Sequence, residues 1–228
     1  MSQKAVVVLS GGLDSSTCLG LAHAEGYQLY ALTFHYGQRH NREVEQAKKI
    51  AQFYQVKEHR LVTLDFLREI GGSSLTDTRL DVPEEESGDK IPNTYVPARN
   101  LIFLSIASAW AEVVGAEKVF IGVSAVDYSG YPDCRPQFIE SMNRTVQLAT
   151  KTAEEGKSIQ IEAPLINLSK GETIKLGIKL GVPYQLTTSC YKGEAIACGR
   201  CDSCRLRIKG FKEAGAKDPI PYAIPINW

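Results

Sequence analysis

The sequence predicts an α/β protein built on a doubly wound parallel sheet, and the first indication lies near its start. Residues 5–9, Ala-Val-Val-Val-Leu, form an apolar run rich in β-branched side chains, typical of a strand buried on both faces. Ser10-Gly11-Gly12 follows at once, and an amphipathic run begins at Asp14. This order predicts a strand, a tight turn and a helix N-terminus, whose free N–H groups and dipole favour an anion. Gly11 and Gly12 lack a Cβ, so both are expected to allow a positive φ and close approach of a phosphate.

Alternating strand and helix patterns along the chain give the second indication of this fold. At these lengths the alternation predicts right-handed parallel crossovers, with ligands bound beyond the carboxyl ends of the strands. Two further segments lie at such ends: 34–38, a place for an adenine, and 124–135, a place for a planar base with Asp127 and Asp133 as acceptors. Later strands are expected at 28–34, 56–62, 118–123 and 159–165, and helices at 41–54, 101–113 and 137–150.

Two cations stand at predicted helix starts. Arg99 falls in the first turn of the helix that follows Pro97, where it opposes the helix dipole, so an anionic partner is expected. Lys170 follows Ser169, a predicted N-cap, and is placed to meet the charge of leaving pyrophosphate. The alternatives are a surface arginine and a solvent-facing lysine. The helix after Arg99 is expected to be central, with one face marked by Ile102, Ile106, Ala109 and Val113.

Four of the six cysteines form a compact pattern near the C-terminus. Cys190, Cys198, Cys201 and Cys204 are spaced C-x7-C-x2-C-x2-C. Four thiolates at this spacing fit a tetrahedral, structural zinc site. An iron–sulfur cluster and thiol redox chemistry are the alternatives, although the x3-C-P continuation of a ferredoxin run is missing. Cys18 is expected to be a small buried apolar residue of the first helix.

Composition limits the classes of function. The chain has 228 residues, with 26 Lys plus Arg against 26 Asp plus Glu, so its net charge is zero and direct nucleic-acid binding is disfavoured. No apolar run approaches the roughly 20 residues of a membrane span, and no signal peptide is recognised, so a cytoplasmic protein is expected. We expect an α/β domain over 1–185, an irregular stretch at 63–97 within it, and a cysteine segment with a tail over 186–228.

The segment Ser10–Ser16 resembles the pyrophosphate loop of the ATP pyrophosphatase superfamily. It fits neither a Walker A loop, because no lysine stands at the helix start, nor the Gly-x-Gly-x2-Gly fingerprint of dinucleotide-binding proteins. Together with four other motifs it makes essentially the whole chain look like the 7-cyano-7-deazaguanine synthase family. Those motifs are Tyr36-Gly37-Gln38-Arg39-His40, Tyr95-Val96-Pro97-Ala98-Arg99-Asn100, the segment Asp127–Arg135 and the four cysteines.

The resemblance implies a Rossmann-like fold of the adenine nucleotide alpha hydrolase type, and a homodimer. It also implies ATP-dependent conversion of 7-carboxy-7-deazaguanine and ammonium into the nitrile, in queuosine biosynthesis. Magnesium near Asp14, catalytic Lys170, Arg99 and Asp14, and structural zinc on the cysteines would then follow. Expected substrate residues are Tyr95, Arg99, Asp127 and Asp133, and expected ATP residues are Leu9, Ser10, Gly11, Gly12, Leu13, Asp14, Ser15 and Ser16.

Two alternatives remain open at this stage. One is a tRNA thiolation enzyme, which shares the loop but needs an RNA-binding surface. The other is a non-enzymatic zinc-ribbon interaction module, which would leave the phosphate loop without a purpose.

Overall fold

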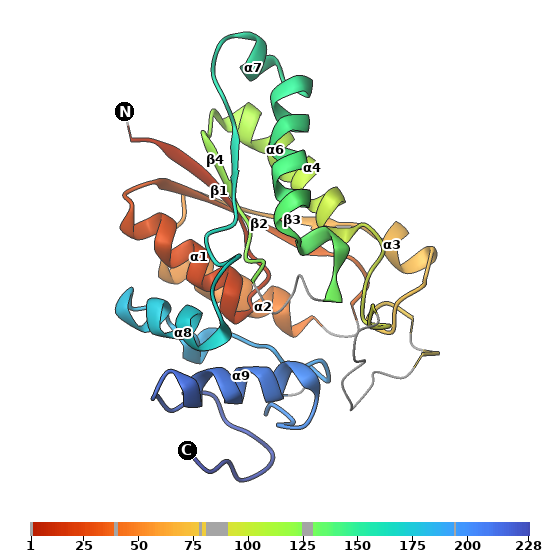
Figure 1. Ribbon diagram of the computed structural model, residues 1–228, viewed down its shortest axis with the longest axis vertical. Coiled ribbons are helices and arrows are strands. Elements are labelled where there is room, and N and C mark those ends of the chain that lie inside the picture. The colour runs from red at the N-terminus through yellow and green to blue at the C-terminus, as the bar shows by residue number, and fades with distance from the viewer. Residues whose placement is uncertain (1, 39–40, 78, 81–90, 125–129, 194) are drawn as a thin grey trace.

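A parallel sheet organises the structure, a computed structural model that describes residues 2–38, 41–77, 79–80, 91–124, 130–193 and 195–228. Within these residues five strands lie in the order β3-β2-β1-β4-β5, all parallel (Figure 1). The doubly wound sheet is therefore confirmed. The strands are β1 (Lys4–Val8), β2 (Gln28–His35), β3 (Glu58–Thr63), β4 (Lys118–Phe120) and β5 (Gln160–Glu162).

Helices cover both faces of this sheet. Side chains of β1 alternate between two cores, with Val6 packed among residues of α4 and α6 and Val7 among residues of α1 and α2. Burial of β1 on both faces is thus confirmed. Beyond the sheet, α8 and α9 lie side by side at the end of the molecule that carries the C-terminus (Figure 1). The α-helices are α1 (Leu13–Ala24), α2 (Arg42–Phe53), α3 (Phe66–Glu69), α4 (Arg99–Val114), α6 (Pro136–Ala149), α7 (Lys151–Glu154), α8 (Lys170–Lys179) and α9 (Asp202–Glu213).

The strand order sets the position of the site. From β1 the chain passes through α1 to β2 on one side, whereas β4 pairs with β1 on the other side. Helices on opposite faces therefore diverge at the carboxyl ends of β1 and β4. This topological switch point is where ligands bind in open α/β sheets.

Some sequence-based boundaries and one helix face differ from the structure. Strand β3 begins at Glu58 rather than 56, and β4 ends at Phe120 rather than 123. The predicted face of α4 is wrong at two of its four positions, because Ala109 and Val113 are exposed, Val113 by 81%. The buried face instead contains Phe103, Leu104, Ala107 and Ala111. Apolar residues occur all around this helix, so periodicity alone does not identify the face that meets the sheet.

The C-terminal segment contains a helix that the sequence analysis did not predict. Helix α9 begins directly after Cys201, and its Phe211 packs with Leu13, Ile174 and Tyr184 in a small core of its own. This core joins the segment to α1 and α8. A division of the chain at residue 185 stays a prediction. Among the described residues, no helix combines the length and the apolar character needed to cross a bilayer.

The β5 edge of the sheet is closed by a side chain. Asn143 on α6 donates its Nδ2 hydrogen to the Ile161 carbonyl at 3.0 Å and accepts the Ile161 N–H at 2.7 Å. Ile161 points these two groups away from β4, so the asparagine amide takes the place of a neighbouring strand. The edge is thereby protected from pairing with other chains.

We predict that Asn143→Ala destabilises the protein by about 1–3 kcal/mol, because it leaves two backbone groups of Ile161 without partners. Urea unfolding followed by circular dichroism measures the change. Thr145→Ala is the matched control, since that hydroxyl is exposed on the same helix and donates to the Ser141 carbonyl within the helix. Equal stabilities of the two variants would contradict the role given to Asn143.

Candidate active site at the switch point

A cavity of about 260 Å³ lies at the carboxyl ends of the strands. The segments after β1, β2 and β4 contribute to its wall, as does the start of α4. The C-terminal segment closes another side. Its lining includes Leu9–Ser10 and Gly12–Ser15 after β1, Phe34 of β2 with Tyr36 and Gln38 after it, Arg99, Asn100 and Phe103 of α4, Ile121–Val123 after β4, and Thr188, Ser189, Tyr191 and Ser203.

The loop after β1 is held by very close packing. Gly11 has a φ of +80°, as predicted, and a Cβ there would collide with the backbone carbonyl of Glu43 on α2. A Cβ on Gly122 would lie 2.7 Å from the Ser15 nitrogen, so the segment after β4 also touches the start of α1. For Gly12 the expectation is corrected: its φ is −84°, an extended N-cap of α1 that needs no left-handed backbone.

Serine side chains brace the same loop. The Ser15 hydroxyl accepts the N–H of Ser10 at 3.1 Å, and the Ser16 hydroxyl donates to the Gly12 carbonyl at 2.7 Å. The loop and the first turn of α1 are therefore fixed in shape before any ligand arrives. First-turn N–H groups of a helix without intrahelical partners favour an anion at this place.

Asp14 and Lys170, far apart in the sequence, form an ion pair beside the loop. The Lys170 ammonium is 2.8 and 2.7 Å from the two Asp14 carboxylate oxygens. Its side chain is only 12% exposed, so Lys170 is not a solvent-facing lysine. The predicted N-cap is confirmed, since Ser169 and Glu172 form a capping box at the start of α8. Asp14 lines the cavity, and Lys170 holds it there.

Arg99 faces the cavity from the first residue of α4. Its Nη1 donates to the Tyr36 hydroxyl at 3.2 Å, and the guanidinium carbon lies 5.6 Å from the centroid of the Tyr36 ring. Burial works against the charge of this guanidinium. Tyr36, Cys134 and Asp133 outweigh burial, so the pKa of Arg99 is raised and the cation persists. Burial also raises the pKa of Tyr36, with Arg99 opposing this effect, so the phenol keeps its proton.

Asp133 and Tyr95, two of the predicted substrate residues, organise the backbone that carries Arg99. The buried Asp133 carboxylate accepts the N–H of Asn100 at 2.9 Å and so caps α4 from a distant segment. The Tyr95 hydroxyl accepts the N–H of Ala98, which has an unusual φ of +54°. Tyr131 and Cys134 line the cavity, while Asp133 is turned to α4. Asp127 lies outside the described residues.

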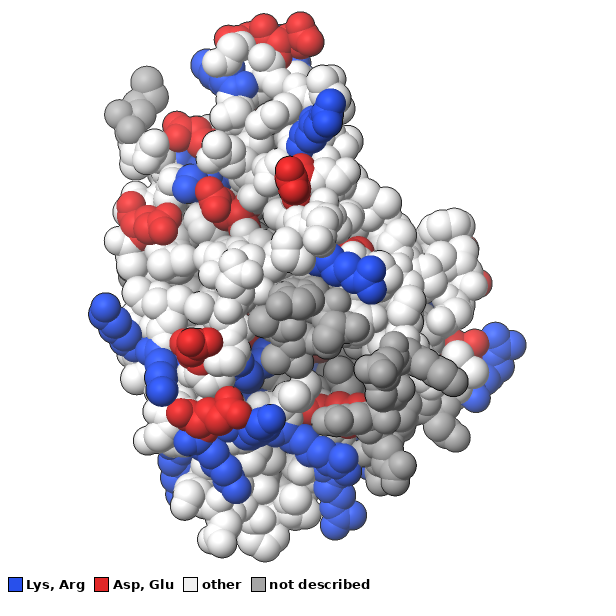
Figure 2. Space-filling view, viewed as in Figure 1, with Lys and Arg blue, Asp and Glu red and all other residues white. Residues whose placement is uncertain are grey.

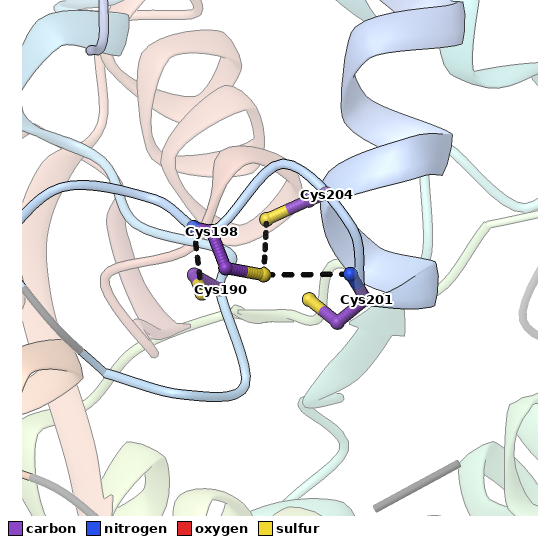
Figure 3. A group of neighbouring side chains, drawn as sticks. All are labelled: Cys190, Cys198, Cys201 and Cys204. Atoms are coloured by element: carbon purple, nitrogen blue, oxygen red, sulfur yellow. Dashed lines mark hydrogen bonds between the residues drawn. The ribbon is translucent and has the colours of Figure 1, made fainter. Parts of the chain in front are cut away.

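The four predicted cysteine ligands meet at one point. Cys190 and Cys198 come from the loop and Cys201 and Cys204 from the start of α9 (Figure 3). Their sulfur atoms lie within 4.8 Å of one another, and all four residues are buried. A tetrahedral zinc with bonds of about 2.3 Å needs sulfurs about 3.8 Å apart. The Cys198 and Cys204 sulfurs are 3.9 Å apart, so this group has the arrangement to hold a metal ion.

Backbone hydrogen bonds favour a negative charge on the Cys198 sulfur. Backbone N–H groups of Arg200 and Cys201 donate to the Cys198 sulfur at 3.4 Å. Hydrogen bonds from the Cys201 and Cys204 thiols lower the pKa of Cys190, and the same contacts raise the pKa of Cys201 and Cys204. Cys18, by contrast, is buried against the Ile121 carbonyl, and burial raises the pKa of its thiol. It is confirmed as a buried residue of α1.

Several cavity residues were missed by the sequence analysis. These residues lie next to or between the cysteines, whose spacing predicts a metal site and gives no signal for a cavity wall: Thr188, Ser189, Tyr191 and Ser203. Their position in the wall depends on the packing of α9 against α1 and α8, which no local pattern reveals. Glu43, which also lines the cavity, was not predicted either. Its position in the first turn of the helix that follows β2 could have indicated this place.

We predict that Asp133→Ala lowers stability by about 1–3 kcal/mol, because the buried N–H of Asn100 loses its acceptor. Asp133→Asn, which keeps an acceptor oxygen, should retain most of that stability. Chemical unfolding of both variants measures the difference. Direct reading of a substrate by Asp133 would give another outcome: both variants would be as stable as the wild type, and both would lose substrate affinity.

Comparison with known proteins identifies the family. A family model described as "Queuosine biosynthesis protein QueC" matches residues 4–215. A 7-cyano-7-deazaguanine synthase of Oceanobacillus iheyensis is 62% identical over 220 residues, which cover 96% of this chain and 98% of that protein. One from Coxiella burnetii (strain RSA 331 / Henzerling II) is 58% identical over 222 residues, with 96% and 98% covered.

Solved structures with lower identity share the fold. An NMN synthetase from Francisella tularensis superposes with a TM-score of 0.52 at 18% identity, covering 95% of this chain and 79% of that one. A predicted subunit of tRNA methyltransferase from Methanocaldococcus jannaschii gives 0.50 at 17% identity, covering 96% and 92%. The family match and the near full-length identities decide the assignment: the chain belongs to the 7-cyano-7-deazaguanine synthase family.

Proposed function

We propose that the chain converts 7-carboxy-7-deazaguanine and ammonium into 7-cyano-7-deazaguanine at the expense of ATP. Membership of the family supports this reaction. The structural observation that supports this reaction is a single cavity whose two sides have different chemical groups. A braced loop at a helix N-terminus forms one side, and Arg99 with the Tyr36 and Tyr131 rings forms another. The first side suits phosphates, and the second suits a planar anionic substrate.

The chemistry requires activation of a carboxylate. A carboxylate is a poor electrophile until one oxygen becomes a leaving group, and adenylation supplies AMP for that purpose. Ammonia then displaces AMP to give an amide, and a second activation allows the amide to lose its oxygen and become the nitrile. Each activation releases pyrophosphate in the superfamily pattern, so the site has to stabilise developing negative charge twice.

The described residues divide this work between them. Residues Leu9–Ser16 would hold the phosphates through backbone N–H groups. Asp14 would contribute a carboxylate to magnesium, which commonly binds through one or two carboxylates and the phosphates of its substrate. Lys170, which fixes Asp14, would neutralise charge on leaving pyrophosphate. Arg99 would neutralise the substrate carboxylate or a phosphate, and Tyr95 would keep the start of α4 in shape.

Zinc is the metal we propose for the cysteine group. Four buried thiolates at tetrahedral spacing form a closed site, whose role is structural. The segment between Cys190 and Cys204 has few apolar residues and makes only a small core of its own. Binding of a metal would therefore contribute directly to its folding.

The remaining proposals concern the oligomeric state and the cellular location of the enzyme, and the two alternative functions. A homodimer in the cytoplasm is what we propose from the family resemblance. The tRNA thiolation alternative finds little support in the overall charge, because the net charge is zero, although basic side chains gather over α8 and α9 on the face shown in Figure 2. A zinc-ribbon interaction module would not explain the cavity at the phosphate loop.

The reaction is tested by incubating purified protein with magnesium-ATP, ammonium and 7-carboxy-7-deazaguanine, and following the products by mass spectrometry. Nitrile formation that depends on ATP, together with AMP, is expected. Arg99→Ala and Lys170→Ala should each lower turnover about 100-fold or more, because a preorganised charge at a developing anion is lost. Lys175→Ala on the exposed face of α8 is the control, with wild-type turnover expected. Wild-type rates in both site variants would refute the charge assignment.

The metal is tested by elemental analysis of the purified protein, where about one zinc per chain is expected. Removal by a chelator should speed amide hydrogen exchange across residues 187–213 while β1 and β2 stay protected, because the cysteine segment loses its cross-link. Iron with visible absorbance, or unchanged exchange after complete removal of the metal, would contradict structural zinc.

A further inference from the structure

A buried ion pair links α9 to the C-terminal tail. The side chains of Arg207 and Asp218 are 2% and 0% exposed. All the N–H donors of the arginine point to acceptors. Nε and Nη2 reach the two Asp218 oxygens at 2.6 and 3.0 Å, Nη1 reaches the Thr187 and Ser189 hydroxyls at 2.7 and 3.3 Å, and Nη2 also reaches the Tyr184 carbonyl at 3.2 Å.

The aspartate is equally well bonded. Besides the arginine, its oxygens accept the Tyr222 hydroxyl at 2.6 Å and the Ile220 N–H at 3.2 Å. A buried ion pair is weak evidence for stability in itself, because apolar residues of similar volume often replace it without loss. A network in which every member has its partners instead fixes one geometry for the segments that it joins.

Those segments belong to the cavity. Thr187 and Ser189, which accept from Arg207, flank Thr188, and the Thr188 N–H donates to the Gly11 carbonyl of the phosphate loop at 3.0 Å. Thr188 and Ser189 line the cavity. A second connection runs through Tyr184, whose hydroxyl shares a 2.8 Å hydrogen bond with Thr17 on α1. The arginine therefore reaches both the loop and the helix that begins at the loop.

The network also reaches the cysteine group. Arg207 lies one turn after Cys204 on α9, so the metal-binding end of this helix sets where the arginine stands. Asp218 brings in the tail that follows the helix. The segment 187–189 is thus clamped from the side opposite to the phosphate loop.

We propose that Arg207 and Asp218 are positioning residues for the phosphate loop and for the cavity wall 187–189. They hold this wall against Gly11, so that the N–H groups of the loop keep the geometry that phosphates need. Neither side chain touches the substrate. The part of this inference that concerns ATP depends on the function proposed above, whereas the structural coupling does not.

The decisive variant replaces both charges at once, R207M/D218L. An apolar pair of similar volume leaves no unpaired buried charge, so the protein is expected to fold. Its melting temperature should be lower than that of the wild type, because the Tyr222 hydroxyl and the Ile220 N–H lose their acceptor. ATP affinity, measured by calorimetry, should nevertheless fall about tenfold or more, which corresponds to about 1.4 kcal/mol. Amides of residues 10–16 should exchange faster. Lys209→Ala, which breaks an exposed pair on α9, is the control, with neither quantity changed.

If the double variant does not fold, a second variant tests the same proposal. Thr187→Val has nearly the same shape and leaves the ion pair intact, but removes one acceptor from the wall. Faster exchange of residues 10–16 and weaker ATP binding are expected, with a smaller effect than in the double variant. Wild-type exchange and affinity in a folded variant of either kind would overturn the proposal. A wild-type protein that binds ATP without forming the nitrile would refute the proposed function alone.

Discussion

The structure depends on how closely three backbone segments approach one another at the end of β1. The turn at Gly11 passes directly beneath the carbonyl of Glu43, and Gly122 lets the segment after β4 touch the first turn of α1. At both places a single methyl group would force backbone to move, which a close-packed interior resists. This contact fixes α1 relative to α2 and β4. The loop after β1, the start of α1 and the segment after β4, which all line the cavity, are thereby fixed relative to one another.

Two cations near this corner share the same arrangement. Arg99 and Lys170 each occupy the first residue of a helix, where the dipole disfavours a cation. In both cases an aspartate from a distant segment compensates: Asp133 accepts an N–H of α4, and Asp14 pairs directly with Lys170. The protein thus maintains two cations at unfavourable places near one cavity. Such an arrangement is expected at a site that handles anions, not in a scaffold.

Much of this could be predicted from the sequence, because the relevant signals are local. The apolar run of β1, the glycine turn, the Ser169 cap and the cysteine spacing each lie within a few residues. What escaped prediction depends on contacts between distant residues. Asp133 as a cap of α4 and Arg207 as a partner of Asp218 have no local signature. The buried face of α4 escaped because apolar residues surround that helix, so only the sheet decides which of them it covers.

The amide of Asn143 has a consequence for the size of the sheet. Doubly wound sheets often continue with a sixth strand beside the fifth. In this protein the outward-facing N–H and carbonyl of Ile161 are already occupied by that amide, and α6 lies where a further strand would need to pair. A further strand therefore cannot pair with β5 at Ile161. Any enlargement of the architecture, whether by an inserted segment within one chain or by strand exchange between chains, has to begin at the opposite border, along β3.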